Sequence, residues 1–325
     1  KLLAWVLALA VSMTLVPVMG QREVQAAKIM NAWDGETTEV PKTDENGTYQ
    51  ISNGAELAWF AKKVNDGASS INGELTDKIY LGDGTSQNKW LMIGDTAEHA
   101  YKGTFNGNGY TVYFLDAEIS EENPDVRYAG LFGVVDGGTI SNVKVSGEVH
   151  NNYAAYKTEG KYEKLYIGSG GIAGYLKSGQ ITGCVNYART TMEGNAMYRN
   201  SGGVVGICSG LVTNCENYGK LSTTISFAQN HTGGIAGLVY GTLSTKVRFA
   251  QHNIGGIAGM EVGPNAVIRY CENKEAVQGY YSVGGIAGGV YQGAAVQNCY
   301  NKAKISGVDT IGGIAGGVNE SSVYA

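Results

Sequence analysis

The chain has 325 residues, of which 49 are glycine, only 4 are proline and 43% are hydrophobic. This composition excludes a disordered chain and favours a β protein with many corners. With 24 basic and 29 acidic residues the net charge is −5 at pH 7, and the sequence has no basic run. A chain with this charge balance is not expected to bind nucleic acid.

The first residues have the features of an export signal. Leu2 to Val18 is an apolar stretch, and Val24-Gln25-Ala26 follows it with a small-residue cleavage pattern. Residues 1–26 are therefore predicted to be a secretory signal peptide, which meets the membrane during export only. The alternative is an uncleaved membrane anchor, which the short span and Pro17 disfavour. The mature protein is expected to be secreted or displayed at the cell surface.

Residues 27–115 are predicted to form a small α+β cap in front of the rest of the chain. Asn53 and Glu56 have the spacing of a capping box. Four apolar residues after them recur at helical spacing and predict one helix: Leu57, Phe60, Ala61 and Val64. Apolar segments predict strands at residues 79–81, 91–93 and 110–115. A cap of this kind would cover the unpaired strand edges at one end of a repeat array.

A short glycine-rich run recurs through residues 116–325. The fullest copy is Gly-Gly-Ile-Ala-Gly at Gly284 to Gly288; other copies begin at Gly170, Gly202, Gly233, Gly255 and Gly312, and a remote one at Ala129. From Gly170 onward the copies start 32, 31, 22, 29 and 28 residues apart, a period typical of stacked supersecondary units. Several glycines per unit disfavour helix by about 1 kcal/mol each relative to alanine. The prediction is an all-β fold, a right-handed parallel β-helix or β-solenoid of about 28-residue repeats with the cap at its N-terminus.

Two sets of residues recur in register with the glycine-rich run and should form ladders inside the stack. The hydrophobic residue of each run predicts one buried column: Ile172, Val204, Ile235, Ile257, Ile286 and Ile314. A second position, 13 to 16 residues into each unit, predicts a small apolar slot: Val143, Cys184, Cys215, Val247, Cys271 and Cys299. Two residues later an asparagine series follows, which Phe249 interrupts: Asn186, Asn217, Asn273 and Asn301.

The cysteines allow two interpretations. Neighbouring copies such as Cys184 and Cys215 would lie one strand spacing apart, about 4.8 Å, so a disulfide is within reach. Because valine takes the same position in two units, we interpret these cysteines as free, buried thiols that fill an apolar slot. Cys208 lies outside this series. No cysteine or histidine spacing is typical of a zinc site, so neither a metal nor a cofactor is expected.

The repeat unit resembles the GLUG motif, a Gly-hydrophobic-Gly repeat of secreted and surface-attached bacterial proteins, including regions that flank IgA-specific metallopeptidases. The resemblance covers residues 129–325, and the stretch Tyr101 to Val112 is similar to the segment that commonly precedes such repeats. It implies a β-solenoid and a bacterial surface location. It implies no catalytic residues.

The units differ in length on one side only, and the longer ones carry extra aromatic residues. These insertions are predicted to project as loops over residues 150–168, 188–200 and 219–231. The loop tyrosines are the candidate ligand-binding residues, because a ring can stack on a sugar or a peptide: Tyr153, Tyr156, Tyr162, Tyr166 and Tyr198. The alternative is that the loops merely cover the stack.

The sequence thus favours a non-catalytic, exported structural stalk or adhesion module whose partner is a host or cell-wall glycan or a surface protein. No His-Glu-x-x-His or Gly-x-Ser-x-Gly motif is present, and the carboxylates from Ala129 onward form no stacked pair. Two alternatives stay open. One is a carbohydrate-active β-helix enzyme, and the other is the non-catalytic N-terminal part of a larger surface peptidase.

Overall fold

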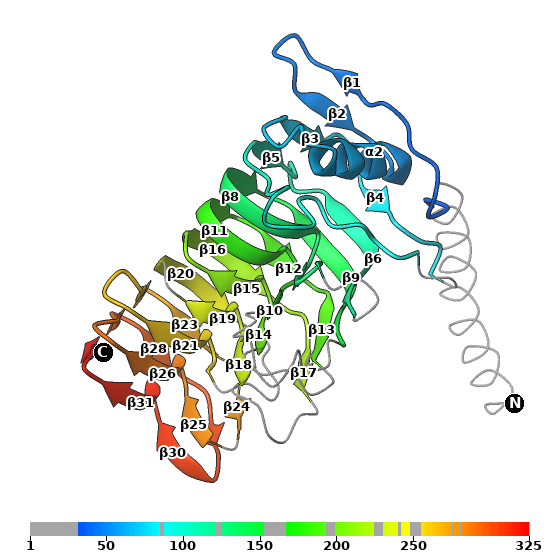
Figure 1. The fold of residues 1–325 in the computed structure, drawn as a ribbon. Coiled ribbons are helices and arrows are strands. Elements are labelled where there is room, and N and C mark those ends of the chain that lie inside the picture. Colours follow the sequence, from blue (N-terminus) through cyan, green and yellow to red (C-terminus); the bar gives the residue numbers. More distant parts are fainter. Residues whose placement is uncertain are drawn as a thin grey trace, which may run out of the picture.

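The structure is a computed structural model that describes residues 32–84, 88–120, 125–152, 167–192, 199–223, 230–239, 242–247, 255–274, 276–279 and 281–324. Within these ranges the chain is mostly β, with the one helix α2 (Gly54–Asn65). The predicted signal peptide lies outside them. In the described part of the chain, no helix is long and apolar enough to cross a membrane. Strands stack from the α2 end to β31 (Ala315–Asn319) at the other end (Figure 1).

The predicted helix is present as α2; Asn53 caps it, and Glu56 bonds back to the residue before the cap. The Asn53 side chain accepts a hydrogen bond of 2.9 Å from the Glu56 amide, and the Glu56 carboxylate accepts one of 2.6 Å from the Ser52 amide. The apolar face is buried through Leu57, Phe60 and Val64. The helix therefore closes one end of the stack with its apolar side turned to the core, as its periodicity indicates.

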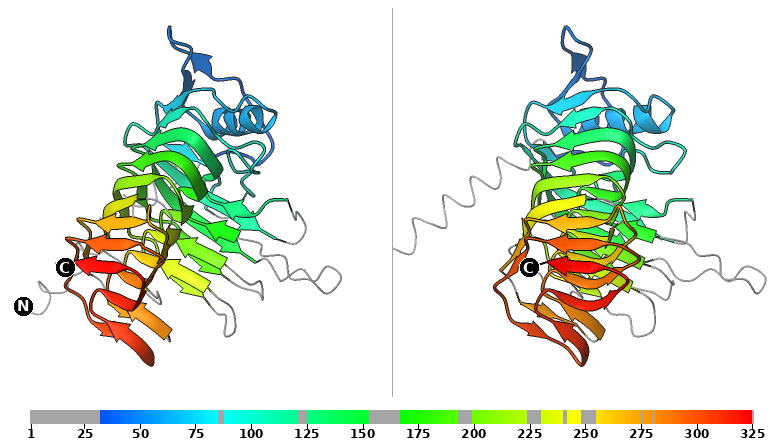
Figure 2. Two further views of the ribbon diagram at one scale, coloured as in Figure 1. Left: turned by 60° about the vertical axis from the view of Figure 1, so that its left-hand side comes forward. Right: turned by 90° about the vertical axis from the view of Figure 1, so that its left-hand side faces the viewer.

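A first column of parallel strands follows the glycine-rich runs. Its members are β8 (Phe132–Ser141), β11 (Ala173–Thr182), β15 (Val205–Cys208), β19 (Ala236–Val239), β21 (Ala258–Val262), β26 (Ala287–Tyr291) and β31. The residue after the Ile of each run keeps one register position, from Phe132 through Ala173 to Ala315. Consecutive repeats thus pair edge to edge (Figure 2).

A second column starts earlier in the chain. It includes the C-terminal halves of β8 and β11 together with β2 (Tyr49–Ile51), β3 (Gly73–Leu75), β5 (Thr104–Asn106), β16 (Leu211–Asn217), β20 (Thr242–Val247), β22 (Val267–Arg269), β27 (Ala295–Gln297) and β32 (Ser322–Tyr324). β1 (Lys42–Thr43) pairs with β2 and is the one antiparallel partner among the described strands. Strands β2, β3 and β5 belong to the region predicted as a cap, so parallel stacking begins well before residue 115.

A third column carries outward-facing charged side chains, which are described under the candidate functional site. It consists of β4 (Ile79–Tyr80), β6 (Thr111–Ile119), β9 (Lys144–Asn151), β12 (Val185–Asn186), β13 (Arg189–Met192), β17 (Leu221–Thr223), β23 (Glu272–Asn273) and β28 (Tyr300–Asn301). The pair β24 (Val277–Gln278) and β29 (Ile305–Ser306) forms a separate small sheet. Residues 91–93, predicted as a strand, contribute only an isolated bridge from Ile93 to Phe132. Met92 and Ile93 are buried and Leu91 is exposed, and the amide of the preceding Trp90 donates to the Asp116 carbonyl.

A fourth column precedes the glycine-rich runs. Its strands are β7 (Tyr128–Ala129), β10 (Ile167–Ser169), β14 (Arg199–Gly202) and β18 (Asn230–Gly233), then β25 (Tyr281–Gly284) and β30 (Asp309–Gly312). Bridges from Gly255 to Gly233 and to Gly284 connect the two groups. The glycine-rich run forms a bend between the fourth and first columns, with the Ile at the bend.

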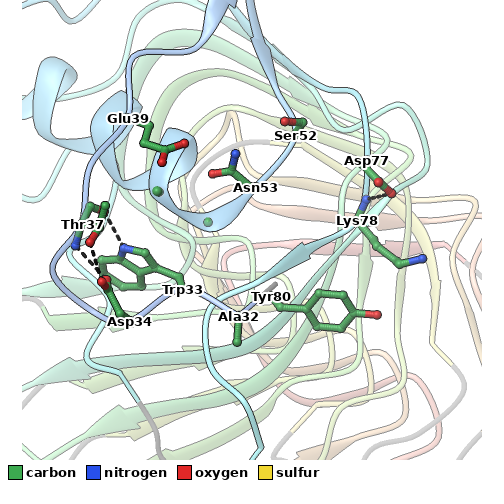
Figure 3. A pocket seen from close by; sticks show the side chains of 12 residues that line it. Ala32, Trp33, Asp34, Thr37, Glu39, Ser52, Asn53, Asp77, Lys78 and Tyr80 are labelled. Carbon is green, nitrogen blue, oxygen red and sulfur yellow. Dashed lines mark hydrogen bonds between the residues drawn. The ribbon is translucent and has the colours of Figure 1, made fainter. Parts of the chain in front are cut away.

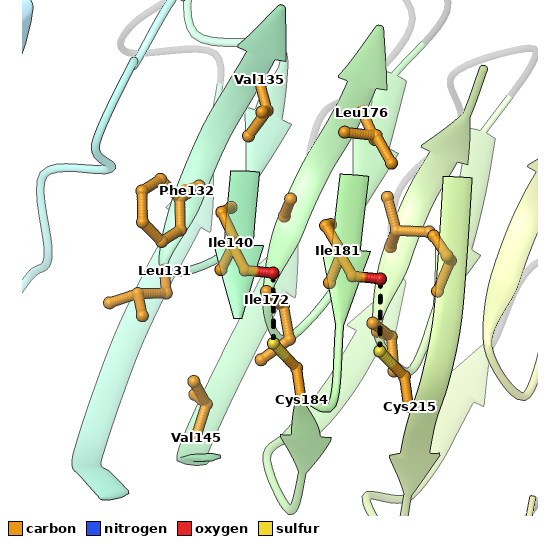
Figure 4. Packing of buried hydrophobic residues seen from close by; sticks show 14 of the residues in the cluster. Leu131, Phe132, Val135, Ile140, Val145, Ile172, Leu176, Ile181, Cys184 and Cys215 are labelled. Atoms are coloured by element: carbon orange, nitrogen blue, oxygen red, sulfur yellow. Dashed lines mark hydrogen bonds between the residues drawn. The ribbon is translucent and has the colours of Figure 1, made fainter. Parts of the chain in front are cut away.

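The predicted Ile column lies in the core. Ile172, Val204, Ile235, Ile257 and Ile286 are fully buried, and Ile314 in the final repeat is half-buried. The slot residues Cys184, Cys215, Cys271 and Cys299 are buried and carry free thiols, as does Cys208. Figure 4 shows Cys184 and Cys215 directed at the carbonyls of Ile140 and Ile181 in the preceding repeat, at 4.0 and 3.7 Å.

The asparagine ladder packs against the glycine-rich run. Asn186 donates to Asn217 at 2.9 Å, and Asn273 donates to Asn301 at 2.9 Å. These amides lie against the second glycine of the run, where a methyl group on Gly171 would collide with Asn186. The second glycine is required because the asparagine ladder fills the space that a side chain would occupy, whereas a side chain on the first glycine, as at Gly170, would meet backbone atoms.

The break in the asparagine series falls at another residue than expected. The repeat spacing predicted Phe249 opposite the asparagines, but Val247 pairs with both Asn217 and Asn273. Phe249 lies outside the described residues. The prediction that Val247 occupies the apolar slot was therefore wrong, and Lys246 stands between Glu216 and Glu272. Relative to the repeat before it, the 22-residue repeat is one residue shorter between the glycine run and this position, which shifts the register, and eight residues shorter after it.

Candidate functional site

The five candidate tyrosines, Tyr153, Tyr156, Tyr162, Tyr166 and Tyr198, lie outside the described residues. The strands that lead toward these insertions are described. β9 and β13 pair in register from Glu148–Arg189 to Asn151–Met192, and β17 pairs with β13 on its other edge. The insertions therefore leave from neighbouring strand ends of one sheet (Figure 1). Parts of the predicted loops, including His150 and residues 189–192, belong to the strands.

The outward face of this sheet carries a group of charged side chains. Along β6 the residues Leu115, Ala117 and Ile119 point into the core, so alternation turns Asp116 and Glu118 outward. On β9 the same alternation turns Glu148 and His150 outward. Parallel register places Asp116 opposite Glu148, and Glu118 opposite His150. Together with Lys89 these four residues form what we call the charged cluster.

Lys89 and His150 each bridge carboxylates. The Lys89 Nζ atom lies 2.6 Å from Glu118 Oε2 and 3.2 Å from Asp116 Oδ2. His150 Nε2 lies 3.0 Å from Glu148 Oε2 and 3.8 Å from Asp116 Oδ1. The carboxylate of Asp116, 2% exposed, is thus held beneath two cationic or potentially cationic groups. The cluster is one connected network rather than separate surface ion pairs.

Hydrogen bonds from the strand ends orient the outer members. His150 Nδ1 lies 2.9 Å from the Thr191 hydroxyl on β13, and Asn152 donates to Glu118 Oε1 at 2.8 Å. Because His150 Nε2 faces carboxylates, which only accept, this nitrogen carries a proton in the neutral ring as well as in the charged one. The imidazole is therefore fixed between two strands at the point where the insertions begin.

The electrostatics of the cluster oppose proton transfer near neutral pH. Hydrogen bonding from Lys89 is the main cause that holds the pKa of Glu118 below its ordinary value. Burial pulls the pKa of Lys89 down, but hydrogen bonds to Glu118 and Asp116 outweigh burial and raise it. A general acid needs a raised carboxyl pKa and a lysine base needs a lowered one. These groups stay charged and are suited to binding a polar ligand.

Sequence reasoning missed this cluster. Lys89, Asp116 and Glu118 precede the repeats, which begin at Ala129. The register also depends on an irregularity between Val112 and Leu115 in β6. The alternation of Asp116-Ala117-Glu118 and Glu148-Val149-His150 was a usable signal for outward polar faces. Among the described residues, no group of three or more His, Cys, Asp or Glu side chains is placed to hold a metal ion.

Comparison with known proteins confirms the repeat motif. The GLUG motif matches residues 279–306, a segment that contains β25, one glycine-rich run, β26, β27, Cys299, β28 and β29. The motif therefore spans one complete passage through the strand columns. No curated protein matches the chain.

A solved structure resembles the chain at a low level. It is described as a "putative immunoglobulin A1 protease" from Bacteroides ovatus, with a TM-score of 0.48 and 16% identity over 89% of this chain and 87% of that one. A likeness of this size does not show a shared activity.

Proposed function

We propose that the protein is an exported, non-catalytic surface module, a right-handed β-solenoid that serves as a stalk and binds a polar partner on one side. The in-register strand columns, with buried Ile, Cys and Asn ladders, support a stiff rod because each repeat is fixed to the next along several lines. The GLUG motif supports a surface location by resemblance.

The observation that carries the binding role is the charged cluster at the strand ends from which the insertions leave. Its exposed atoms, the Lys89 ammonium and the Glu118 and Glu148 carboxylates, provide hydrogen-bond donors and acceptors to solvent. The loop tyrosines start a few residues further along the chain and can add stacking area. A surface glycan or a polar peptide fits this combination of charge, amide, hydroxyl and ring.

Two assays on one sample separate binding from catalysis. The full chain is applied to a glycan array and to intact host cells, and the release of reducing sugar from the bound glycans is followed in parallel. Retention without release is expected. Turnover of any polysaccharide would replace this proposal by that of a carbohydrate-active enzyme.

A matched pair of substitutions locates the binding face. Glu118→Gln removes a lysine-paired carboxylate of the charged cluster, and Glu272→Gln removes a similar one, paired with Lys302 at 2.6 Å on a later strand of the same column. Attachment should weaken in the first variant and persist in the second. Equal attachment of both variants, and of a variant with all five loop tyrosines changed to alanine, would place the partner site elsewhere.

A further inference from the structure

The outward face of the third column carries aromatic side chains at one position of successive strands. Tyr80 of β4 and Tyr113 of β6 stand opposite each other in register, and their rings stack with centroids 5.1 Å apart and an interplanar angle of 17°. Tyr187, which follows β12, and Tyr218, which follows β16, stack in the same way at 5.1 Å and 15°. Both distances are close to the spacing of neighbouring strands, about 4.8 Å. Each ring therefore occupies one rung of an aromatic ladder.

One rung of this ladder has no ring. Ser146 of β9 stands in the same row between Tyr113 and Tyr187, because the residues before all three are paired across β6, β9 and β12 (Figure 1). Those preceding residues are buried, so alternation turns Ser146 and the two tyrosines outward. Two strand spacings, about 9.6 Å, separate the row positions of the two tyrosines. The short serine side chain leaves a gap between their rings, and Tyr187 is 48% exposed.

The bulge of β6 adds Phe114 next to Tyr113 but does not fill this gap. The Phe114 ring lies toward β4, with its centroid 6.3 Å from that of Tyr80, and a methyl group on Gly84 would come within 3.2 Å of it. β4 pairs with the edge of β6 that faces away from β9. Tyr80 and Phe114 thus lie on one side of Tyr113, and the other side of its ring faces the rung of Ser146.

Polar side chains lie at both ends of the gap. Lys144 and Glu148 are on the same face of β9 as Ser146, two residues before and two residues after it. Arg189 is exposed and stands opposite Glu148 in register. Lysine and arginine side chains only donate hydrogen bonds, a carboxylate only accepts them, and the serine hydroxyl does both. The edge of the gap therefore offers donors and acceptors, while its two walls are aromatic.

This arrangement fits a saccharide ring. A pyranose ring has C–H groups on its two faces, which pack against aromatic rings, and hydroxyl groups around its edge, which donate and accept hydrogen bonds. An aromatic side chain of a partner would use the two walls but not the charged groups at the edge. A small anion would use the cations but not the walls.

We propose that one sugar residue of a glycan binds above Ser146, between the rings of Tyr113 and Tyr187, and that Lys144, Glu148 and Arg189 bond its hydroxyl groups. This inference rests on the proposed function, because it names the partner of the same face of the sheet. Glu148 belongs both to the charged cluster and to the edge of the gap, so a glycan chain that leaves the gap passes directly over the cluster.

Two substitutions test the gap from opposite directions. Tyr187→Ala removes one wall, whereas Ser146→Tyr supplies the missing ring and fills the gap. The full chain and its variants are titrated by calorimetry with a panel of neutral and uronic-acid oligosaccharides. Tyr187→Ala should weaken binding about three- to tenfold. Ser146→Tyr should abolish binding while its melting temperature equals or exceeds that of the parent, because the new ring stacks on both neighbours.

Tyr300→Ala is the matched control, since Tyr300 is an exposed tyrosine of the same column in a later repeat. It should bind as the parent does. Equal affinity of the parent and Ser146→Tyr would place the sugar elsewhere. A Ser146→Tyr variant that melts below the parent would show that the rung is not vacant. Titration with N-acetyltryptophanamide is run alongside, and tighter binding of this compound, lost in Ser146→Tyr, would identify a site for an aromatic side chain instead.

Attachment of the same samples to intact host cells separates this inference from the proposed function. If the parent attaches and Glu118→Gln weakens attachment, but no oligosaccharide binds at millimolar concentration, the saccharide site is refuted and the surface-binding role stands. If the parent neither attaches to cells nor binds any oligosaccharide, both are refuted.

Discussion

Glu261 should make the stability of the later repeats depend on pH. This residue lies in β21 between Val239 and Val290 of the neighbouring strands, and its side chain points into the core with 0% exposure. Neither carboxyl oxygen has a hydrogen-bond partner among the described residues. Burial is the main cause that raises the pKa of Glu261 from 4.5 to about 9, with a smaller contribution from Cys299. The folded protein therefore keeps this carboxyl protonated at neutral pH.

The sign and size of the effect follow from proton linkage. Between pH 4.5 and 9 the unfolded chain has released the Glu261 proton while the folded chain retains it, so the free energy of unfolding falls as pH rises. The slope is about 1.4 kcal/mol per pH unit, which amounts to about 3 kcal/mol lost between pH 4.5 and pH 7. The stabilisation is complete below the unfolded pKa and disappears as pH approaches the folded one.

Urea unfolding at pH 5.5, 7 and 8.5 measures this slope. Glu261→Val, which matches the flanking residues of the column, should remove the Glu261 contribution to the slope and raise the free energy of unfolding at pH 7 by about 3 kcal/mol. Glu272→Gln is the control, because hydrogen bonding from Lys302 holds the pKa of that partly exposed carboxyl below its ordinary value and its proton is absent across this range. Identical slopes for the parent and Glu261→Val would show that the carboxyl is solvated or paired.

Three further substitutions test the interior. Gly285→Ala should lower the free energy of unfolding by about 1–3 kcal/mol, because the methyl group would collide with Gly313 and Asn301, whereas Gly313→Ala, with nothing within 4 Å, should be neutral; equal denaturation midpoints would refute the contact. Ile257→Asp should cost several kcal/mol by burying an unpaired carboxylate, and an unchanged melting curve would remove Ile257 from the core. Asn217→Leu should cost about 1–3 kcal/mol by breaking its bonds to Asn186 and Gly219, seen as faster hydrogen exchange in β16.

Much of the strand stack was predictable because its signals are local and repeated. The period of the glycine-rich run set the repeat, and alternation along a strand turned Ile172 and its equivalents inward. The helix α2 was predictable because Asn53, Glu56 and the spaced apolar residues after them act within a few residues of one another. Signals of this range are contained in the amino-acid order alone.

The candidate sites could not be predicted in the same way. The charged cluster joins Lys89 to β6 and β9, which are separated in the chain by connections of varied length, and its register depends on the strained Phe114. A cavity beside the start of α2, lined by Trp33, Asn53 and Tyr80 among others (Figure 3), depends on the hydrogen bond from the Trp33 amide to the Tyr80 carbonyl, which no periodicity encodes. The sequence also could not show that Val247, and not Phe249, pairs with the asparagines. A shorter repeat can lack residues on either side of a strand, and the spacing does not say on which.

Repeat length, inward-facing residues and the helical cap thus followed from the order of amino acids, since propensity and alternation act over a few neighbours. The three-dimensional structure alone decided which residues distant in the chain lie against each other, as Gly171 does against Asn186 and Asp116 against His150. The physical reason is that a shift of one residue at a single bulge turns every following side chain to the other face, and the energy of the whole packed stack selects the register.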